Sequence, residues 1–123
     1  MLMSRESQPG RDTTKFIQLE STPVFEREGF TGRILYDAPD GTARHLLIEV
    51  FGHHPEKRMT GDTTRSYHVM SGYGTFILNG RSEQVFQGDT VVINPDGSYQ
   101  YSGEMVLYET NVSPSGTITD EKL

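Results

Sequence analysis

The chain has 123 residues, a length typical of a single domain, with no cysteine and a formal net charge of −6. The lack of cysteine excludes a disulfide framework and a thiolate metal site, and the acidic charge disfavours nucleic-acid binding. No run approaches the roughly 18 apolar residues of a membrane-spanning helix. The polar first residues lack the apolar core of a signal peptide. We therefore expect a cytoplasmic protein that binds neither nucleic acid nor membranes.

The first half of the chain predicts short strands after a polar start. Residues 1–14 predict a flexible arm, and residues 16–20 predict a first strand at the start of one domain that spans 15–113. A second strand is expected around residues 34–36. The clearest pattern is in 43–51, where Leu46, Ile48 and Val50 share one face and His45, Leu47 and Glu49 share the other.

The second half predicts more strands, separated by turn residues, after an expected loop at 52–64. The expected strands cover 65–70, 74–78, 83–86, 90–93, 99–102 and 105–112. Asn79-Gly80 between two β-like runs predicts a tight hairpin. Residues 114–123 predict a flexible tail. Short strands with regular turns and no helical periodicity indicate an all-β sandwich or barrel.

Two glycine-framed segments resemble the motifs of the cupin superfamily. Gly52, Arg58, Thr60, Arg65 and Gly72 follow the spacing of the first motif, in which a Gly precedes a His-x-His pair, a Glu and another Gly. The second motif is similar to the run from Gly88-Asp89 through Pro95 to Tyr99. The resemblance covers about residues 43–112 and implies a single cupin barrel, a double-stranded β-helix or jelly roll.

The positions that hold a divalent metal in that family carry other residues here. They align with Arg58, Thr60, Arg65 and Tyr99, with Gln100 as the alternative to Tyr99. A guanidinium is always charged and has no lone pair to donate to a metal, and two such cations would repel one. We therefore predict no metal site and no cofactor. A noncanonical metal site using His45, Glu49 and a loop His (His53 or His54) is a minor alternative.

The substituted positions predict a pocket for a small anion inside the barrel. Alternation places Arg65, Tyr67 and Val69 on one face and Ser66, His68 and Met70 on the other. The resemblance implies that the first face points into the barrel, because Arg65 aligns with a metal-ligand position. Guanidinium forks suit carboxylate or phosphate, so an anionic or oxygenated ligand is expected. The predicted ligand-binding residues are Arg58, Thr60, Arg65, Tyr67, Tyr99, Tyr101 and Ile48, with Leu46, Val50, Phe76 and Leu78 as further walls.

Three functions remain open from the sequence. The first is a metal-independent isomerase, epimerase, lyase or cyclase, in which Tyr99 or Tyr67 transfers protons and Arg65 stabilises charge. The second is a module that binds or senses a small molecule without chemistry. The third is a decayed barrel retained for assembly. Separately, Arg65 could form a buried ion pair with a carboxylate such as Glu49 or Glu109 and have no role in ligand binding. The family resemblance also implies a homodimer.

Overall fold

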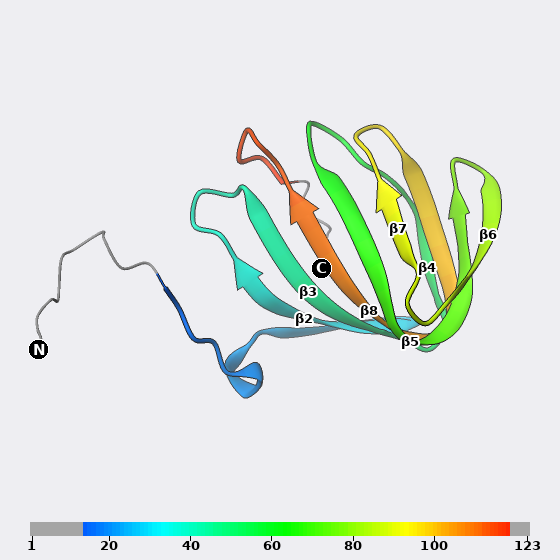
Figure 1. Cartoon of the computed structure of the whole chain (residues 1–123), viewed down its shortest axis with the longest axis horizontal. Coiled ribbons are helices and arrows are strands. Elements are labelled where there is room, and N and C mark those ends of the chain that lie inside the picture. Colours follow the sequence, from blue (N-terminus) through cyan, green and yellow to red (C-terminus); the bar gives the residue numbers. More distant parts are fainter. Residues whose placement is uncertain (1–13, 119–123) are drawn as a thin grey trace, which may run out of the picture.

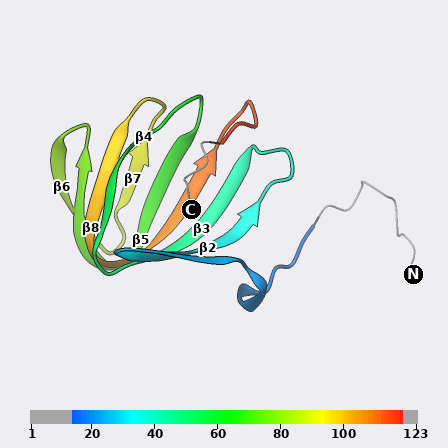
Figure 2. The same ribbon diagram turned by 180° about the vertical axis from the view of Figure 1, so that it is seen from behind.

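The structure, a computed structural model, describes residues 14–118. The arm expected at 1–14 and the tail expected at 114–123 lie outside the described residues, apart from Thr14 and residues 114–118. Residues 14–18 lead away from the barrel without regular structure (Figure 2). In the described part of the chain, no helix is long and apolar enough to cross a membrane.

Regular structure in residues 14–118 is almost entirely β (Figure 1). After a short 3-10 turn, η1 (Leu19–Ser21), the strands are β1 (Val24–Arg27), β2 (Phe30–Asp37), β3 (Ala43–Val50), β4 (His53–Arg58), β5 (Thr64–Leu78), β6 (Arg81–Phe86), β7 (Thr90–Ile93) and β8 (Ser98–Val112). This confirms the predicted all-β class.

Two local predictions were wrong. Residues 16–20 form no strand, because the hydroxyls of Ser21 and Thr22 donate to the carbonyls of Gln18 and Leu19 and close a turn there. The expected loop at 52–64 contains β4, which pairs with the first part of β8. Strand β1 was not predicted.

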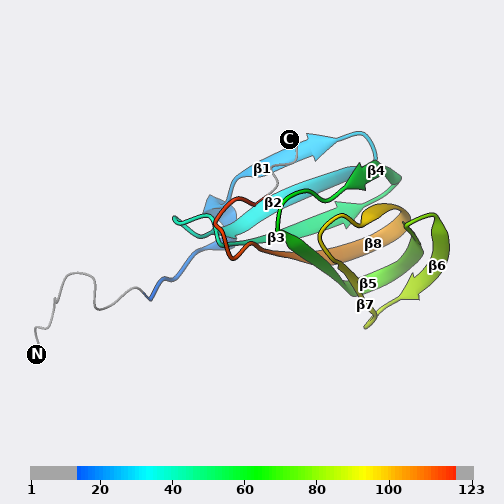
Figure 3. The same ribbon diagram turned by 90° about the horizontal axis from the view of Figure 1, so that it is seen from above.

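Two long strands organise the barrel. Each of β5 and β8 has 15 residues, where the sequence predicted two separate short strands. They pair antiparallel from Thr64–Val112 to Leu78–Tyr99. On its other edge β8 pairs with β3 and then β4, and the other edge of β5 pairs with β7 and then β6. The long strands therefore belong to two facing sheets at once, and β1 and β6 lie on opposite sides of the barrel (Figure 3).

Glycine permits the bend at which β5 and β8 pass from one sheet to the other. Gly72 has φ +85°, and a Cβ on it would lie 2.1 Å from the Glu104 carbonyl oxygen. Gly103, on the facing strand, has φ +142° and is equally crowded by the backbone of Tyr73. Only glycine accommodates both the dihedral angles and this close approach. The predicted hairpin is also confirmed, since Asn79 (φ 50°) and Gly80 (φ 81°) form a turn with positive φ at both central residues.

The core lies between the two sheets. The inner faces predicted by alternation are confirmed, because Leu46, Ile48 and Val50 from β3 are buried together with Tyr67 and Val69 from β5. Buried aromatic rings from β8 and Phe76 from β5 complete the core on the opposite sheet. Polar groups are buried among these apolar side chains, and they define the candidate site.

Candidate functional site: a buried polar cluster in the barrel

A buried ion pair lies at one end of the barrel interior. Arg65, the second residue of β5, is the cross-strand partner of Asn111 on β8 and of Ile93 on β7. Its Nε atom lies 3.2 Å from Glu109 Oε2, and the two side chains are only 2% and 4% exposed. Asn111 connects both groups, because its Oδ1 accepts a hydrogen bond from Arg65 Nε and its Nδ2 donates to Glu109 at 2.8 Å. The charge on Arg65 is thus balanced inside the protein.

Two tyrosine hydroxyls extend this network. Arg65 Nη1 donates to the Tyr99 hydroxyl oxygen at 2.6 Å, and the Tyr67 hydroxyl donates to the same oxygen at 3.1 Å. Both tyrosines are fully buried. Burial raises the pKa of Tyr67 well above its ordinary value of 10.0, and the negative charge of Glu109 raises it further. Tyr67 therefore keeps its proton at neutral pH and acts as a hydrogen-bond donor.

His54 lies against the tyrosines from the other side, on β4. Its ring stacks on Tyr99 with centroids 5.4 Å apart, and the centroid of Tyr101 lies 4.8 Å away. The sequence suggested a solvated loop histidine, but His54 is only 4% exposed. The signal that could have found it is alternation, since in a strand one of two adjacent histidines must face inward.

The His54 ring has a defined tautomer. Its Nδ1 lies 2.6 Å from the carbonyl oxygen of Pro55, which can only accept a hydrogen bond. Nδ1 therefore carries the proton in the neutral ring, and the lone pair is on Nε2. This arrangement suits a proton acceptor.

Two predicted pocket residues lie elsewhere. Arg58 and Thr60 are exposed, and Arg58 Nη1 donates to the backbone carbonyl of Asp96 at 2.5 Å. The register of β4 shifts between His54 and Lys57, so residues after this irregularity face the opposite way. The expectation that Arg58 and Thr60 face the interior was therefore wrong. Arg65, Tyr67, Tyr99 and Tyr101 do face it, and Ile48 is buried in the apolar part of the core.

The cluster adjoins a hollow of about 250 Å³ at the β7–β8 loop. The hollow includes Ile93 and Leu78, which are the cross-strand partners of Arg65 and Tyr99. A second hollow of about 330 Å³ has His54 and Tyr101 among its lining residues, together with exposed or half-buried residues of β4, β5 and β8.

Solved structures with the same arrangement identify the fold. The structure of Pac13, a nucleoside dehydratase from Streptomyces, matches with a TM-score of 0.73 and 22% identity over 81% of this chain and 82% of that chain. KdgF from Halomonas matches with a TM-score of 0.70 and 12% identity, covering 81% of this chain and 94% of that one. An RmlC-like cupin from Shewanella frigidimarina matches with a TM-score of 0.68 and 14% identity over 81% and 91%. The fold is that of the cupins.

Comparison of the sequence with protein families and curated proteins gave no match, whereas the structure also matches variants of the Streptomyces protein. No family model and no curated protein matches the sequence significantly. Three further matched structures are PAC13 variants with uridine, at 20% or 21% identity. One carries a His→Gln substitution, and the other two carry Tyr→Phe substitutions at different positions.

The positions that align with the metal ligands of the cupin motifs carry Arg58, Thr60, Arg65 and Tyr99 in this chain. Among residues 14–118, no group of three or more His, Cys, Asp or Glu side chains is placed to hold a metal ion. The alternative site of His45, Glu49 and a loop histidine is not formed, because His45 bonds the Tyr108 hydroxyl, which faces outward, whereas His54 is inside the cupin barrel. The side chains of the cluster therefore fit proton transfer and hydrogen bonding better than metal ligation.

Proposed function

We propose that this chain is an acid–base enzyme that eliminates water from a nucleoside or a similar hydroxylated sugar derivative. The observation that carries the proposal is the convergence of His54, Tyr67 and Tyr101 inside the barrel. These three residues have the same separations along the chain as the His and the two Tyr substituted in the PAC13 variants. Elimination of water belongs to the lyase class that the sequence left open.

His54 is the proposed base. Elimination begins with removal of a proton from a substrate carbon, and the lone pair on Nε2 of the neutral His54 ring accepts it. The rings of Tyr99 and Tyr101 pack against the imidazole and fix its orientation. A fixed base supports proton transfer better than a mobile one, since no conformational search precedes the reaction.

Tyr67 is the proposed acid. Its raised pKa keeps the hydroxyl protonated, so it can supply a proton to the departing hydroxyl group. The C–H electron pair then forms the new double bond, the C–O bond breaks, and water leaves. Proton return from His54 to Tyr67 restores both groups. Arg65 donates a hydrogen bond to the Tyr99 oxygen and so strengthens the Tyr99 hydroxyl as a donor to an oxygen that gains negative charge during the reaction.

Closure of the site supports this chemistry but also favours a competing function. The side chains of Arg65, Tyr67, Tyr99, Tyr101 and His54 are at most 4% exposed, although His54 and Tyr101 also line a hollow of about 330 Å³. A closed site excludes water and strengthens electrostatic interactions. The same closure favours a module that holds a ligand without turnover, which is the second candidate function.

The test combines product analysis with two matched variants. Purified protein is incubated with a panel of nucleosides, and products that have lost one water are detected by mass spectrometry, with and without a chelator. We expect turnover that survives chelation. His54→Gln should lower turnover by about 10²–10⁴-fold. His53→Gln, on the adjacent exposed residue of the opposite face, should leave it unchanged.

Calorimetry with uridine separates the two candidate functions. Saturable uridine binding with no dehydrated product from any nucleoside would support binding without turnover. Absence of both binding and product would contradict the proposal.

A further inference from the structure

We infer that Glu109 makes the barrel interior select uncharged ligands, so that nucleosides are accepted and their phosphorylated forms are rejected. The inference rests on the proposed function, because it concerns the ligand of the same site. It replaces the expectation, drawn from the sequence, that the pocket binds an anion.

The first support is that the charge of Arg65 is already balanced. Glu109 Oε2 lies 3.2 Å from Arg65 Nε, and both side chains are almost fully buried. Asn111 and Tyr99 accept two further hydrogen bonds from the guanidinium. An anion could bind Arg65 only by competing with a carboxylate that is fixed on the neighbouring strand. In an environment of low dielectric constant, that competition is unfavourable.

The second support is the negative charge at the same end of the barrel. Asp62 precedes β5 and accepts hydrogen bonds from Ser113 and Ser115, just beyond the Arg65–Asn111 pair. Asp40, in the hairpin between β2 and β3, accepts hydrogen bonds from the hydroxyl and amide of Thr42. These hydrogen bonds lower the pKa of both carboxyl groups, which therefore remain ionised at neutral pH.

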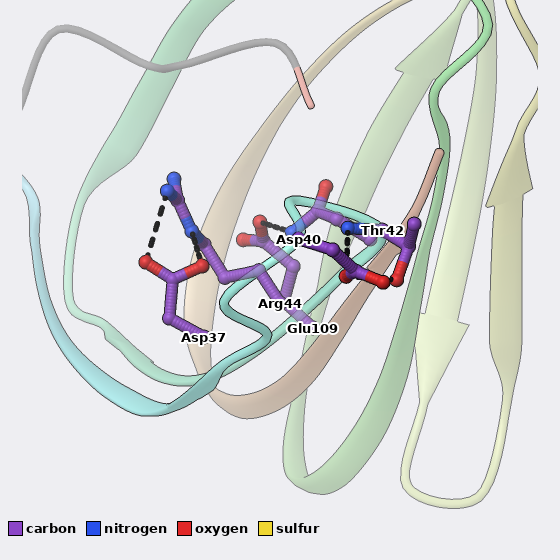
Figure 4. A network of polar contacts seen from close by, with 6 residues as sticks. Asp37, Asp40, Thr42, Arg44 and Glu109 are labelled. Carbon is purple, nitrogen blue, oxygen red and sulfur yellow. Dashed lines mark hydrogen bonds and ion pairs between the residues drawn. The ribbon is translucent and has the colours of Figure 1, made fainter. Parts of the chain in front are cut away.

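The basic residues at this end also have partners. Figure 4 shows Arg44 directed at Asp37, with Glu109 in the same region, and Arg44 Nη2 lies 3.2 Å from Asp37 Oδ2. Glu109 on β8 is the cross-strand partner of Leu46 on β3, and Arg44 lies two residues before Leu46 on β3. Arg58 is exposed and bound to the Asp96 carbonyl. A phosphate that approached the cluster would therefore meet mainly negative or neutralised groups.

The first experiment compares one neutral and one charged ligand. Isothermal titration of the full chain with uridine and with uridine 5′-monophosphate measures both dissociation constants. Because Glu109 already balances Arg65, a phosphate would lose its hydration without gaining an ion pair, so we expect the monophosphate to bind about 10-fold more weakly than uridine or weaker still. Equal or tighter binding of the monophosphate would overturn the inference.

The second experiment does not depend on the proposed function. Glu109→Gln leaves Arg65 without its carboxylate, and inorganic phosphate should then raise the melting temperature by about 5–6 °C at ten times its dissociation constant. The wild type and Glu49→Gln, which alters an exposed glutamate on the outer face, should show no such shift. Stabilisation of the wild type by phosphate would also overturn the inference, even if no nucleoside binds.

A folding defect in Glu109→Gln would leave the uridine comparison in the wild type as the deciding measurement. If uridine fails to bind while phosphate stabilises only Glu109→Gln, the proposed function fails and the charge selectivity stands. If uridine binds and Glu109→Gln folds but gains no response to phosphate, the selectivity does not come from Glu109.

Discussion

Removal of either partner of the Arg65–Glu109 pair should destabilise the fold strongly, and removal of both should cost much less. Arg65→Met removes the cationic partner of the buried Glu109 carboxylate, which keeps its hydrogen bond from the neutral amide of Asn111. Breaking a buried pair in this way costs about 3–5 kcal/mol. Glu109→Leu should cost a similar amount, since it leaves a buried guanidinium. If the two effects were independent, the double variant would lose about 6–10 kcal/mol.

The double variant contains no buried charge from this pair. Its remaining loss of stability comes from the side-chain amide of Asn111, which is fully buried and loses its hydrogen bonds to both Arg65 and Glu109. A buried polar group without its hydrogen bonds costs about 1–3 kcal/mol. We therefore expect the double variant to be more stable than either single variant, with a coupling energy of several kcal/mol.

Urea unfolding of the four proteins, followed by circular dichroism, measures these differences. The matched control is the surface pair of Arg81 and Glu83, whose atoms lie closer, at 2.7 Å, but whose side chains are 71% and 47% exposed. Arg81→Met should cost less than about 1 kcal/mol, because solvent screens the pair. Additive losses at Arg65 and Glu109, or a loss below about 1 kcal/mol for Arg65→Met, would refute the reasoning.

Three further predictions concern pH and backbone geometry. Burial raises the pKa of Tyr67, so the protonated hydroxyl contributes its full stabilisation below pH 10.0, and this stabilisation is lost as the pH rises above 10.0. The free energy of unfolding should therefore fall less steeply with alkaline pH in Tyr67→Phe than in the wild type. Hydrogen bonds from Ser113 and Ser115 lower the pKa of Asp62, so the ionised carboxylate contributes its full stabilisation above pH 3.8, and this stabilisation is lost as the pH falls through the lowered pKa. Hydrogen exchange at the Ser115 amide should accelerate in that acidic range, and in Asp62→Asn it should already be faster at neutral pH. Gly72→Ala should lower the free energy of unfolding by more than about 3 kcal/mol in urea titrations, whereas Gly80→Ala, which has positive φ but open space, should cost about 1 kcal/mol.

Local alternation predicted the parts of the site that lie on long regular strands. Every second side chain faces the interior along β8, and along β5 before the irregularity between Val69 and Ser71. Alternation therefore grouped Arg65 with Tyr67 and Tyr99 with Tyr101, and the resemblance to the cupin motifs indicated which face points inward. The pairing of Arg65 with Glu109 was among the alternatives. Alternation could not choose between them, because a cross-strand partner depends on register, which is a long-range property.

The errors occurred where the chain departs from regular geometry. The register shift in β4 reverses the facing of the residues that follow it, so counting along a family motif placed Arg58 inside the barrel. The same strand brings His54 to the interior, although its polar sequence resembles a loop. Its burial depends on pairing with β8 and on stacking against Tyr99 and Tyr101, and neither contact is local in sequence.

A guanidinium and a divalent metal ion supply different chemistry. Both are cations, and both can be balanced by a carboxylate such as Glu109. A metal ion, however, accepts an electron pair from a substrate oxygen, whereas Arg65 can only donate hydrogen bonds. The groups suited to the proposed acid–base chemistry are the Nε2 lone pair of His54, which can accept a proton, and the Tyr67 hydroxyl, which stays protonated at neutral pH and can donate to a departing oxygen. Elimination with one base and one acid is the simplest chemistry that these side chains support.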